Sequence, residues 1–285
     1  MFKKTIILLA LAFGLQSASQ ATYSELSMCP EVPSSTSGAV GNFLSNITGT
    51  NFIMTKIAES AAQKELKKEF NSKFNVELYP FGGKSLLDGK FKGVKLESKK
   101  IASDDLNTTN FSASSLCDYN HVTLKDNNLY FVENFLMEYS AQITNDDLQR
   151  TILSPSYLKL LERLNLKIAG FTVFKVADPS IEIKGDRLLM SVKTLAPAPF
   201  NATQTINVNA GVKVENEKIV FSDIKMGSLG NLDLNSVLPL VNRMNPFVHK
   251  VPLDEKNIAT IRIKDVRIEN NTVWAKGLVV IPQTR

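Results

Sequence analysis

The sequence predicts an α+β fold in which one long helix is followed by a highly curved antiparallel β-sheet and by short additional helices. Two patterns support this prediction. Apolar residues recur at helical spacing between residues 52 and 70, and from Phe74 onward most of the chain alternates between apolar and polar residues. No self-similarity at the periods of solenoid or propeller folds is found. We therefore expect one folded domain over residues 51–285.

The first 21 residues have the three-part order of a secretory signal peptide. Lys3 and Lys4 precede an apolar run of about 11 residues, and the small residues Ser19 and Ala21 follow it. This run is too short to span a bilayer, which takes about 20 residues. We expect cleavage after Ala21 and an extracytoplasmic mature protein, either periplasmic or secreted.

Residues 22–50 are expected to form a linker before the domain. They are rich in Ser, Thr and Gly and contain few large apolar residues. Such a composition buries little apolar surface.

The long helix is expected over residues 52–70. Ile53, Ile57 and Phe70 share one side, and lysines and glutamates occupy the other. At 1.5 Å per residue, such a helix is about 30 Å long. Its length suits the spine of a domain.

Three shorter helices are expected later in the chain. Thr144 and Asp147 form a capping-box pattern, and Ser154 followed by Pro155 suits an N-cap and the first helical position. A further helix is expected over residues 236–244.

Turn signals predict antiparallel hairpins in the second half of the chain. They lie at Gly185-Asp186, at residues 215–218 and at Asn270-Asn271. The alternation slips at Lys264-Asp265, as at a β-bulge. Residues 82–85 imitate the end of a phosphate-binding loop without its first glycine, and we expect a β-turn there.

The charge distribution argues against nucleic-acid binding. The formal net charge is +5, and Lys and Arg are spread along the chain. A nucleic-acid binder usually concentrates them in a basic patch. The mild positive charge is compatible with weak, peripheral attraction to anionic lipid head groups.

The two cysteines, Cys29 and Cys117, allow two interpretations. In an exported protein they could form one disulfide that ties the N-terminal segment to the domain. Alternatively, both remain unpaired, because spacing alone does not show proximity.

The chain offers little material for catalysis or metal binding. His121 and His249 are its only histidines. Cys117 and His121 are four residues apart, but their context is typical of a loop entering a strand, so a nucleophilic pair is not favoured. Residues 227–230 lack the pattern of a serine nucleophile. We expect a non-enzymatic protein without catalytic residues, metal or cofactor.

The order of elements resembles the LmeA-like family of exported phospholipid-binding proteins, relatives of the tubular lipid-binding superfold of bactericidal/permeability-increasing protein. The segments that carry the resemblance are Phe74–Pro80, Leu86–Leu96, Ile143–Leu148 with Ser154-Pro155, and Asn245–Phe247 through Pro252-Leu253 to the hairpin of residues 261–280. The resemblance implies a highly curved antiparallel sheet wrapped around the long N-terminal helix. It also implies an apolar cavity that takes acyl chains.

A bent sheet has more inward apolar surface than one slim helix covers, which favours such a cavity. The expected apolar lining is Phe52, Ile53, Ile57, Leu148, Ile152, Leu158, Leu161, Val237, Leu240 and Met244. Each of these residues would serve equally as ordinary core.

The expected function is binding or transfer of phospholipid-like amphiphiles in support of the cell envelope. The alternatives are a secreted β-rich structural or adhesion module that binds a protein partner, and an envelope hydrolase.

Overall fold

The computed structural model describes residues 28–33, 50–102, 107–125, 128–163, 165–168, 171–196, 202–227, 241, 245–248 and 260–283. The expected signal peptide, most of the expected linker and all of the expected 236–244 helix except Val241 lie outside these residues.

The first sheet has eight antiparallel strands, in the order β12-β13-β6-β3-β2-β4-β5, with β1 paired to β2. Their bounds are β1 Asn75–Pro80, β2 Lys90–Ala102, β3 Asn107–Ser115, β4 Asn120–Lys125, β5 Asn128–Phe131, β6 Phe135–Ile143, β12 Thr260–Glu269 and β13 Thr272–Ile281. The last hairpin of the chain thus returns to pair with β6.

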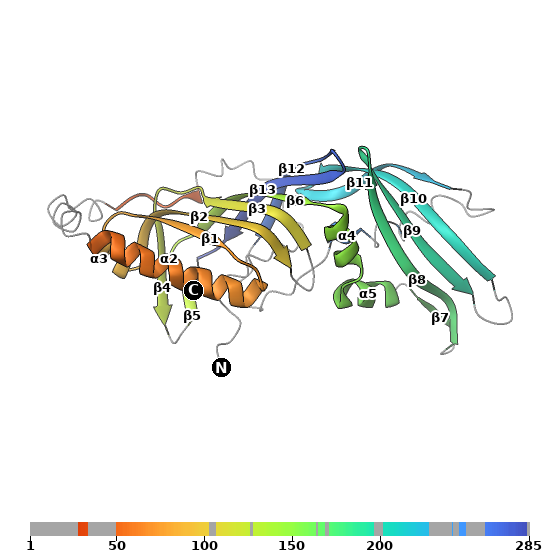
Figure 1. The fold of residues 1–285 in the computed structure, drawn as a ribbon, viewed down its shortest axis with the longest axis horizontal. Coiled ribbons are helices and arrows are strands. Elements are labelled where there is room, and N and C mark those ends of the chain that lie inside the picture. Colours follow the sequence, from red (N-terminus) through yellow and green to blue (C-terminus); the bar gives the residue numbers. More distant parts are fainter. Residues whose placement is uncertain are drawn as a thin grey trace.

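The second sheet has five antiparallel strands in sequence order, β11-β10-β9-β8-β7. Their bounds are β7 Leu166–Ile168, β8 Phe171–Lys184, β9 Arg187–Ala196, β10 Ala202–Glu215 and β11 Lys218–Met226. The two sheets follow one another along the long axis of the molecule (Figure 1).

The predicted architecture, one curved sheet wrapped around a long helix, is therefore wrong. The structure is mostly β and has two sheets, because the strands from β7 to β11 pair in sequence order with one another and form a meander separate from the first sheet. Period-two alternation identifies strands, but it does not say which strands pair.

The helix α2, Thr50–Phe70, packs on β1 and on the short helix α3, Gly83–Leu87, instead of lying at the centre of a sheet. Leu66 and Phe70 are buried on its inner side together with Glu59. Glu59 accepts the backbone N–H of Leu78 at 2.9 Å, on an edge strand. The helix therefore shields the open edge of β1.

The helices α4, Asn145–Ile152, and α5, Pro155–Glu162, lie between the two sheets along the chain and in space (Figure 1). Thr144 and Asp147 form the predicted capping box, and Ser154 caps α5 with Pro155 in its first turn. Both helix starts are confirmed.

The helix α4 joins the sheets through hydrogen bonds on two sides. Thr109 of β3 donates to the buried carboxylate of Asp147 at 2.8 Å. On the other side, Asn145 Nδ2 donates to the carbonyl of Ile183 in β8 at 3.2 Å. One helix thus fixes the position of the second sheet relative to the first.

The predicted hairpin turns are confirmed. Lys184 pairs with Arg187, Glu215 with Lys218 and Glu269 with Thr272, which leaves two residues in each turn. Positive φ angles at Asn216 and Glu217, and at Asn270 and Asn271, match the turns that suit twisted strands. The register of β12 and β13 shifts between Ile263 and Asp265, which confirms the predicted bulge.

The expected β-turn at residues 82–85 is instead the start of α3. The short helix η3, Pro246–Val248, packs on β11 and α4. One hydrophobic cluster runs through the inner faces of both sheets, and its most buried members include Met137, Ile143, Leu148, Ile152, Ile183, Leu188, Ile219 and Phe247.

Candidate functional site

The expected lining residues of the long helix lie at the surface. Phe52, Ile53 and Ile57 are 68, 56 and 60% exposed. They lie in the first turns of α2, while its inner side is formed by Glu59, Leu66 and Phe70.

The expected lining residues of the later helices lie elsewhere. Leu148, Ile152 and Leu161 are buried in the core, and Leu158 is 39% exposed. Val237, Leu240 and Met244 lie outside the described residues. The structure thus divides the described members of this set between an exposed helix end and the core, and does not bring them together.

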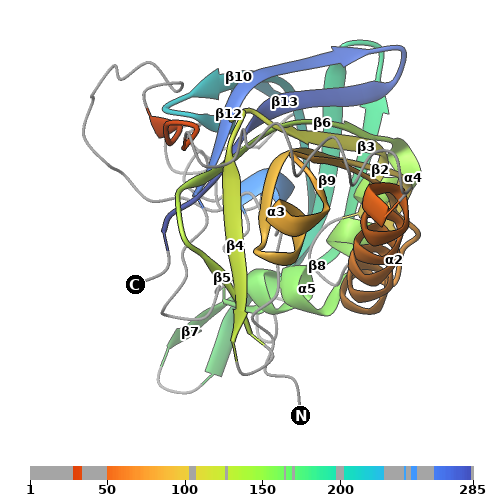
Figure 2. The ribbon, with the colours of Figure 1, turned by 90° about the vertical axis from the view of Figure 1, so that its left-hand side faces the viewer.

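A candidate surface is formed where the first turns of α2 meet α3. Leu87 at the end of α3 is 69% exposed, and α3 packs on α2. The first turns of α2 and the helix α3 lie at the same end of the molecule, and this end faces the viewer in Figure 2. We call Phe52, Ile53, Ile57 and Leu87 the apolar tip. Leu87 was missed because the Gly82-Gly83 pair is typical of a turn.

Exposed lysines accompany the apolar tip. Lys56 Nζ lies 5.9 Å from the centre of the Phe52 ring and 2.6 Å from Glu59 Oε2. Lys84 is exposed on α3, and Lys64 is exposed further along α2. The first turn of α2 contains no acidic residue.

Glu59 keeps a negative charge despite its burial. Burial by itself raises the pKa of the carboxyl, but hydrogen bonds from Lys56 and the Leu78 N–H, with the charge of Lys56, outweigh it and lower the pKa below its ordinary value. This ionised group fixes Lys56 next to the apolar tip.

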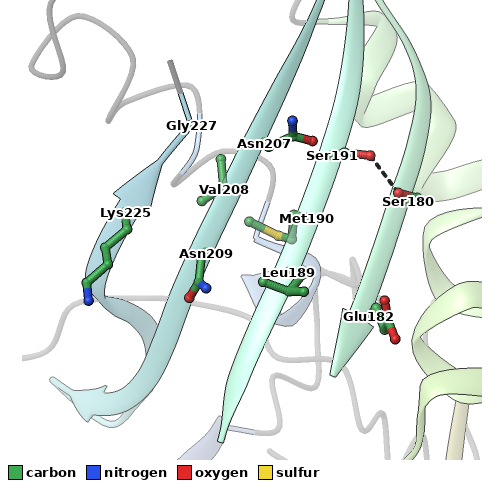
Figure 3. Close-up of a pocket in the computed structure, with 10 residues that line it drawn as sticks. All are labelled: Ser180, Glu182, Leu189, Met190, Ser191, Asn207, Val208, Asn209, Lys225 and Gly227. Carbon is green, nitrogen blue, oxygen red and sulfur yellow. Dashed lines mark hydrogen bonds between the residues drawn. The ribbon is translucent and has the colours of Figure 1, made fainter. Parts of the chain in front are cut away.

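A second candidate site is a groove on the outer face of the five-stranded sheet (Figure 3). Its volume is about 420 Å³. Leu188, Met190 and Val192 point to the core, so the alternate residues Leu189 and Ser191 face outward into the groove. The groove is lined by Ser180, Glu182, Leu189, Met190, Ser191, Asn207, Val208, Asn209, Lys225 and Gly227. We call it the outer groove.

The two cysteines form a disulfide, with sulfur atoms 2.09 Å apart. The bond connects Cys29 in the N-terminal segment to the loop after β3, across 88 residues of sequence. Burial, followed by the charge of Lys90, lowers the pKa of the nearby His121. Because Cys117 is bonded to Cys29, it carries no thiolate. Cys117 and His121 therefore do not form a nucleophilic pair.

Two further tests concern metals and membranes. Within the described ranges, no three His, Cys, Asp or Glu side chains come together to hold a metal ion. No helix in the described part of the chain is both long enough and apolar enough to cross a bilayer.

Comparison with known proteins adds no relative. The sequence matches no protein-family model, and no curated protein or solved structure is significantly similar to it. The resemblance to the LmeA-like family therefore stays a prediction.

Proposed function

We propose that this protein binds phospholipid at a membrane surface outside the cytoplasm and has no enzymatic role. The observation that carries the proposal is the apolar tip, in which four large side chains are each more than half exposed. Exposed apolar clusters rimmed by polar residues are typical of interaction sites.

The energetics favour insertion of this tip into the boundary between head groups and acyl chains. Full burial of a Phe, Ile or Leu side chain contributes about 1.5–3 kcal/mol. The lipid site in this proposal is a surface at the end of α2, in place of the enclosed cavity expected from the sequence.

Electrostatics favour an anionic membrane. Lys84 lies on α3 and Lys64 lies on α2, the two helices that carry the tip, whereas the charge of Lys56 is offset by Glu59. A lysine near an anionic lipid surface contributes about 1 kcal/mol. Apolar insertion and lysine attraction together suit reversible peripheral binding.

The disulfide supports an extracytoplasmic location. Such bonds persist mainly in oxidising compartments. This agrees with the secretory signal expected from residues 1–21. We propose further that lipid binding in this location supports maintenance of the cell envelope.

Vesicle flotation tests the proposal. The mature protein should float with vesicles of phosphatidylcholine and phosphatidylglycerol, and less with phosphatidylcholine alone. The double variant Ile53→Ser/Ile57→Ser should bind at least about tenfold more weakly, because it removes apolar surface that enters the bilayer. Its fold should be unchanged, because both side chains are exposed.

Leu153→Ser is the matched control. Leu153 is 58% exposed at the C-cap of α4, away from the tip. It should bind vesicles as the wild type does. If the wild type floats with neither vesicle, or if Ile53→Ser/Ile57→Ser floats equally well, the proposal fails. The alternative of a β-rich module for a protein partner then becomes the better hypothesis.

A further inference from the structure

Eight of the ten residues that line the outer groove form two rows that run straight across four strands. Glu182 of β8 pairs with Leu189 of β9, Leu189 with Asn209 of β10, and Asn209 with Lys225 of β11. Residues that are paired in this way lie side by side on one face of a sheet. We call this set the charged row.

The second row lies next to it and is uncharged. Ser180 pairs with Ser191, and Ser191 with Asn207. Gly227 continues the row by donating its N–H to the Asn207 carbonyl at 3.1 Å. We call this set the polar row.

The charged row has opposite charges at its two ends. Glu182 and Lys225 are both exposed, and neither forms a salt bridge within the described part of the chain. Three strand spacings separate them, which is about 14 Å. Their side chains cannot neutralise one another, so each is available to a ligand of opposite charge.

The middle of the groove is ordered and suited to hydrogen bonding. Arg187 Nε donates to Asn209 Oδ1 and holds this amide side chain in place. The hydroxyl groups of Ser180 and Ser191 are 2.7 Å apart (Figure 3). Leu189 adds a half-buried apolar contact between the two charges.

We propose that the outer groove binds a short peptide with free termini, with its ammonium group at Glu182 and its carboxylate at Lys225. An extended chain advances about 3.3 Å per residue, so about four residues span the distance. The amide and hydroxyl groups of the polar row would bond to the peptide backbone, and Leu189 would contact a side chain. This proposal does not depend on membrane binding by the apolar tip.

The lining favours a peptide over a sugar chain. Sugar rings commonly stack on aromatic faces, and the lining residues of the outer groove include no aromatic side chain. Opposite charges at the ends match a zwitterion that is long enough to reach both.

Titration of the isotope-labelled protein with tetraalanine tests the proposal. The backbone amide signals of Ser191, Asn207 and Gly227 should shift, with a dissociation constant on the order of 1 mM. N-acetylation or C-terminal amidation of the peptide should each weaken binding about two- to fivefold, as expected for exposed ion pairs. Dialanine should bind more weakly because it reaches only one charge.

Charge variants assign each terminus. Glu182→Gln should weaken tetraalanine and should make binding insensitive to N-acetylation, while it remains sensitive to amidation. Lys225→Gln should show the reverse pattern. Lys193→Gln is the control, because Lys193 lies on β9 outside the groove lining, paired to Asp178 at 3.0 Å.

A steric variant tests the place of binding. A Cβ atom at Gly227 would lie 3.8 Å from Asn207 Cβ, which is an ordinary contact. Gly227→Leu should therefore fold normally and obstruct the end of the polar row.

The proposal is overturned if tetraalanine shifts none of these signals, or if blocked and free peptides bind equally. It is also overturned if an uncharged oligosaccharide binds the same residues irrespective of Glu182→Gln and Lys225→Gln.

Discussion

Ile183 donates its backbone N–H to Asn145 Oδ1 and accepts a hydrogen bond from Asn145 Nδ2, so one side chain takes the place of a neighbouring strand. Gln149 Nε2 donates in the same way to the carbonyl of Ile181. The edge of β8 is thus covered by α4, which also bonds to β3.

Asn145→Ala is expected to destabilise the protein by about 1–3 kcal/mol, because it leaves the N–H and C=O of Ile183 without partners. Urea denaturation measures the loss, and amide hydrogen exchange should be faster at Ile183. Asp146→Ala, at the exposed neighbouring position, should cost less, about 0.3–1 kcal/mol. Equal losses in the two variants would contradict the bridging role of Asn145.

Glu59 should make stability depend on acid pH. Its folded pKa is lowered, as described above, so its contribution is fully present above the unfolded pKa of about 4.3 and is lost as pH falls through the folded value. Glu59→Gln should reduce the slope of unfolding free energy against pH in this range. At neutral pH it should destabilise by about 1–2 kcal/mol.

Denaturation curves between pH 7 and the acid range check this prediction. Glu97→Gln is the control: its partner Lys95 lies 2.7 Å away, but both side chains are exposed, so stability at neutral pH should hardly change. If the unfolding free energy of Glu59→Gln has the same slope against pH as that of the wild type, Glu59 is not the source of the acid dependence.

Reduction of the disulfide should destabilise the fold. The bond closes a segment of 88 residues, for which the chain-entropy model gives about 4.6 kcal/mol. Denaturation with and without a reductant measures this loss. The double variant Cys29→Ser/Cys117→Ser should match the reduced wild type and should not respond to the reductant.

Tyr139→Phe is expected to leave stability unchanged or to raise it by about 1 kcal/mol. The Tyr139 side chain is buried, and its hydroxyl has no hydrogen-bond partner among the residues that the structure describes, so its removal ends a desolvation cost. Thermal unfolding measures the change. Tyr79→Phe, which removes an exposed hydroxyl 3.0 Å from Glu77, provides the comparison. A clear loss in Tyr139→Phe would indicate a bound water at that hydroxyl.

Local chemistry was enough to predict the hairpin turns and the starts of α4 and α5, but not the start of α3. The Asn270-Asn271 turn and the Thr144–Asp147 capping box depend on residues close in sequence, and both are present. Pairing between distant strands is not encoded locally. Nothing in the sequence near Ile143 indicates that it pairs with Val273, so that β6 lies beside β13. The sequence therefore did not show that the strands divide into two sheets.

The same limit applies to the candidate sites. The spacing of Ile53 and Ile57 predicted a helix but not which side would face the sheet, and the inner side instead includes Glu59. The Gly185-Asp186 turn implies that Glu182 lies beside Leu189, so half of the charged row was accessible from sequence. The pairing of β9 with β10 was not, because the sequence between them has no two-residue turn signal like the one at Gly185-Asp186.

The return of the last hairpin to β6 has a consequence for synthesis. Gln283 donates its N–H to Asn134 Oδ1, 149 residues earlier in the chain. Until the ribosome has released the C-terminal strands, the edge of β6 has no partner, and an unpaired edge is prone to intermolecular association. Chains truncated before β12 should therefore aggregate, and maturation should be slow because its final step joins such distant segments.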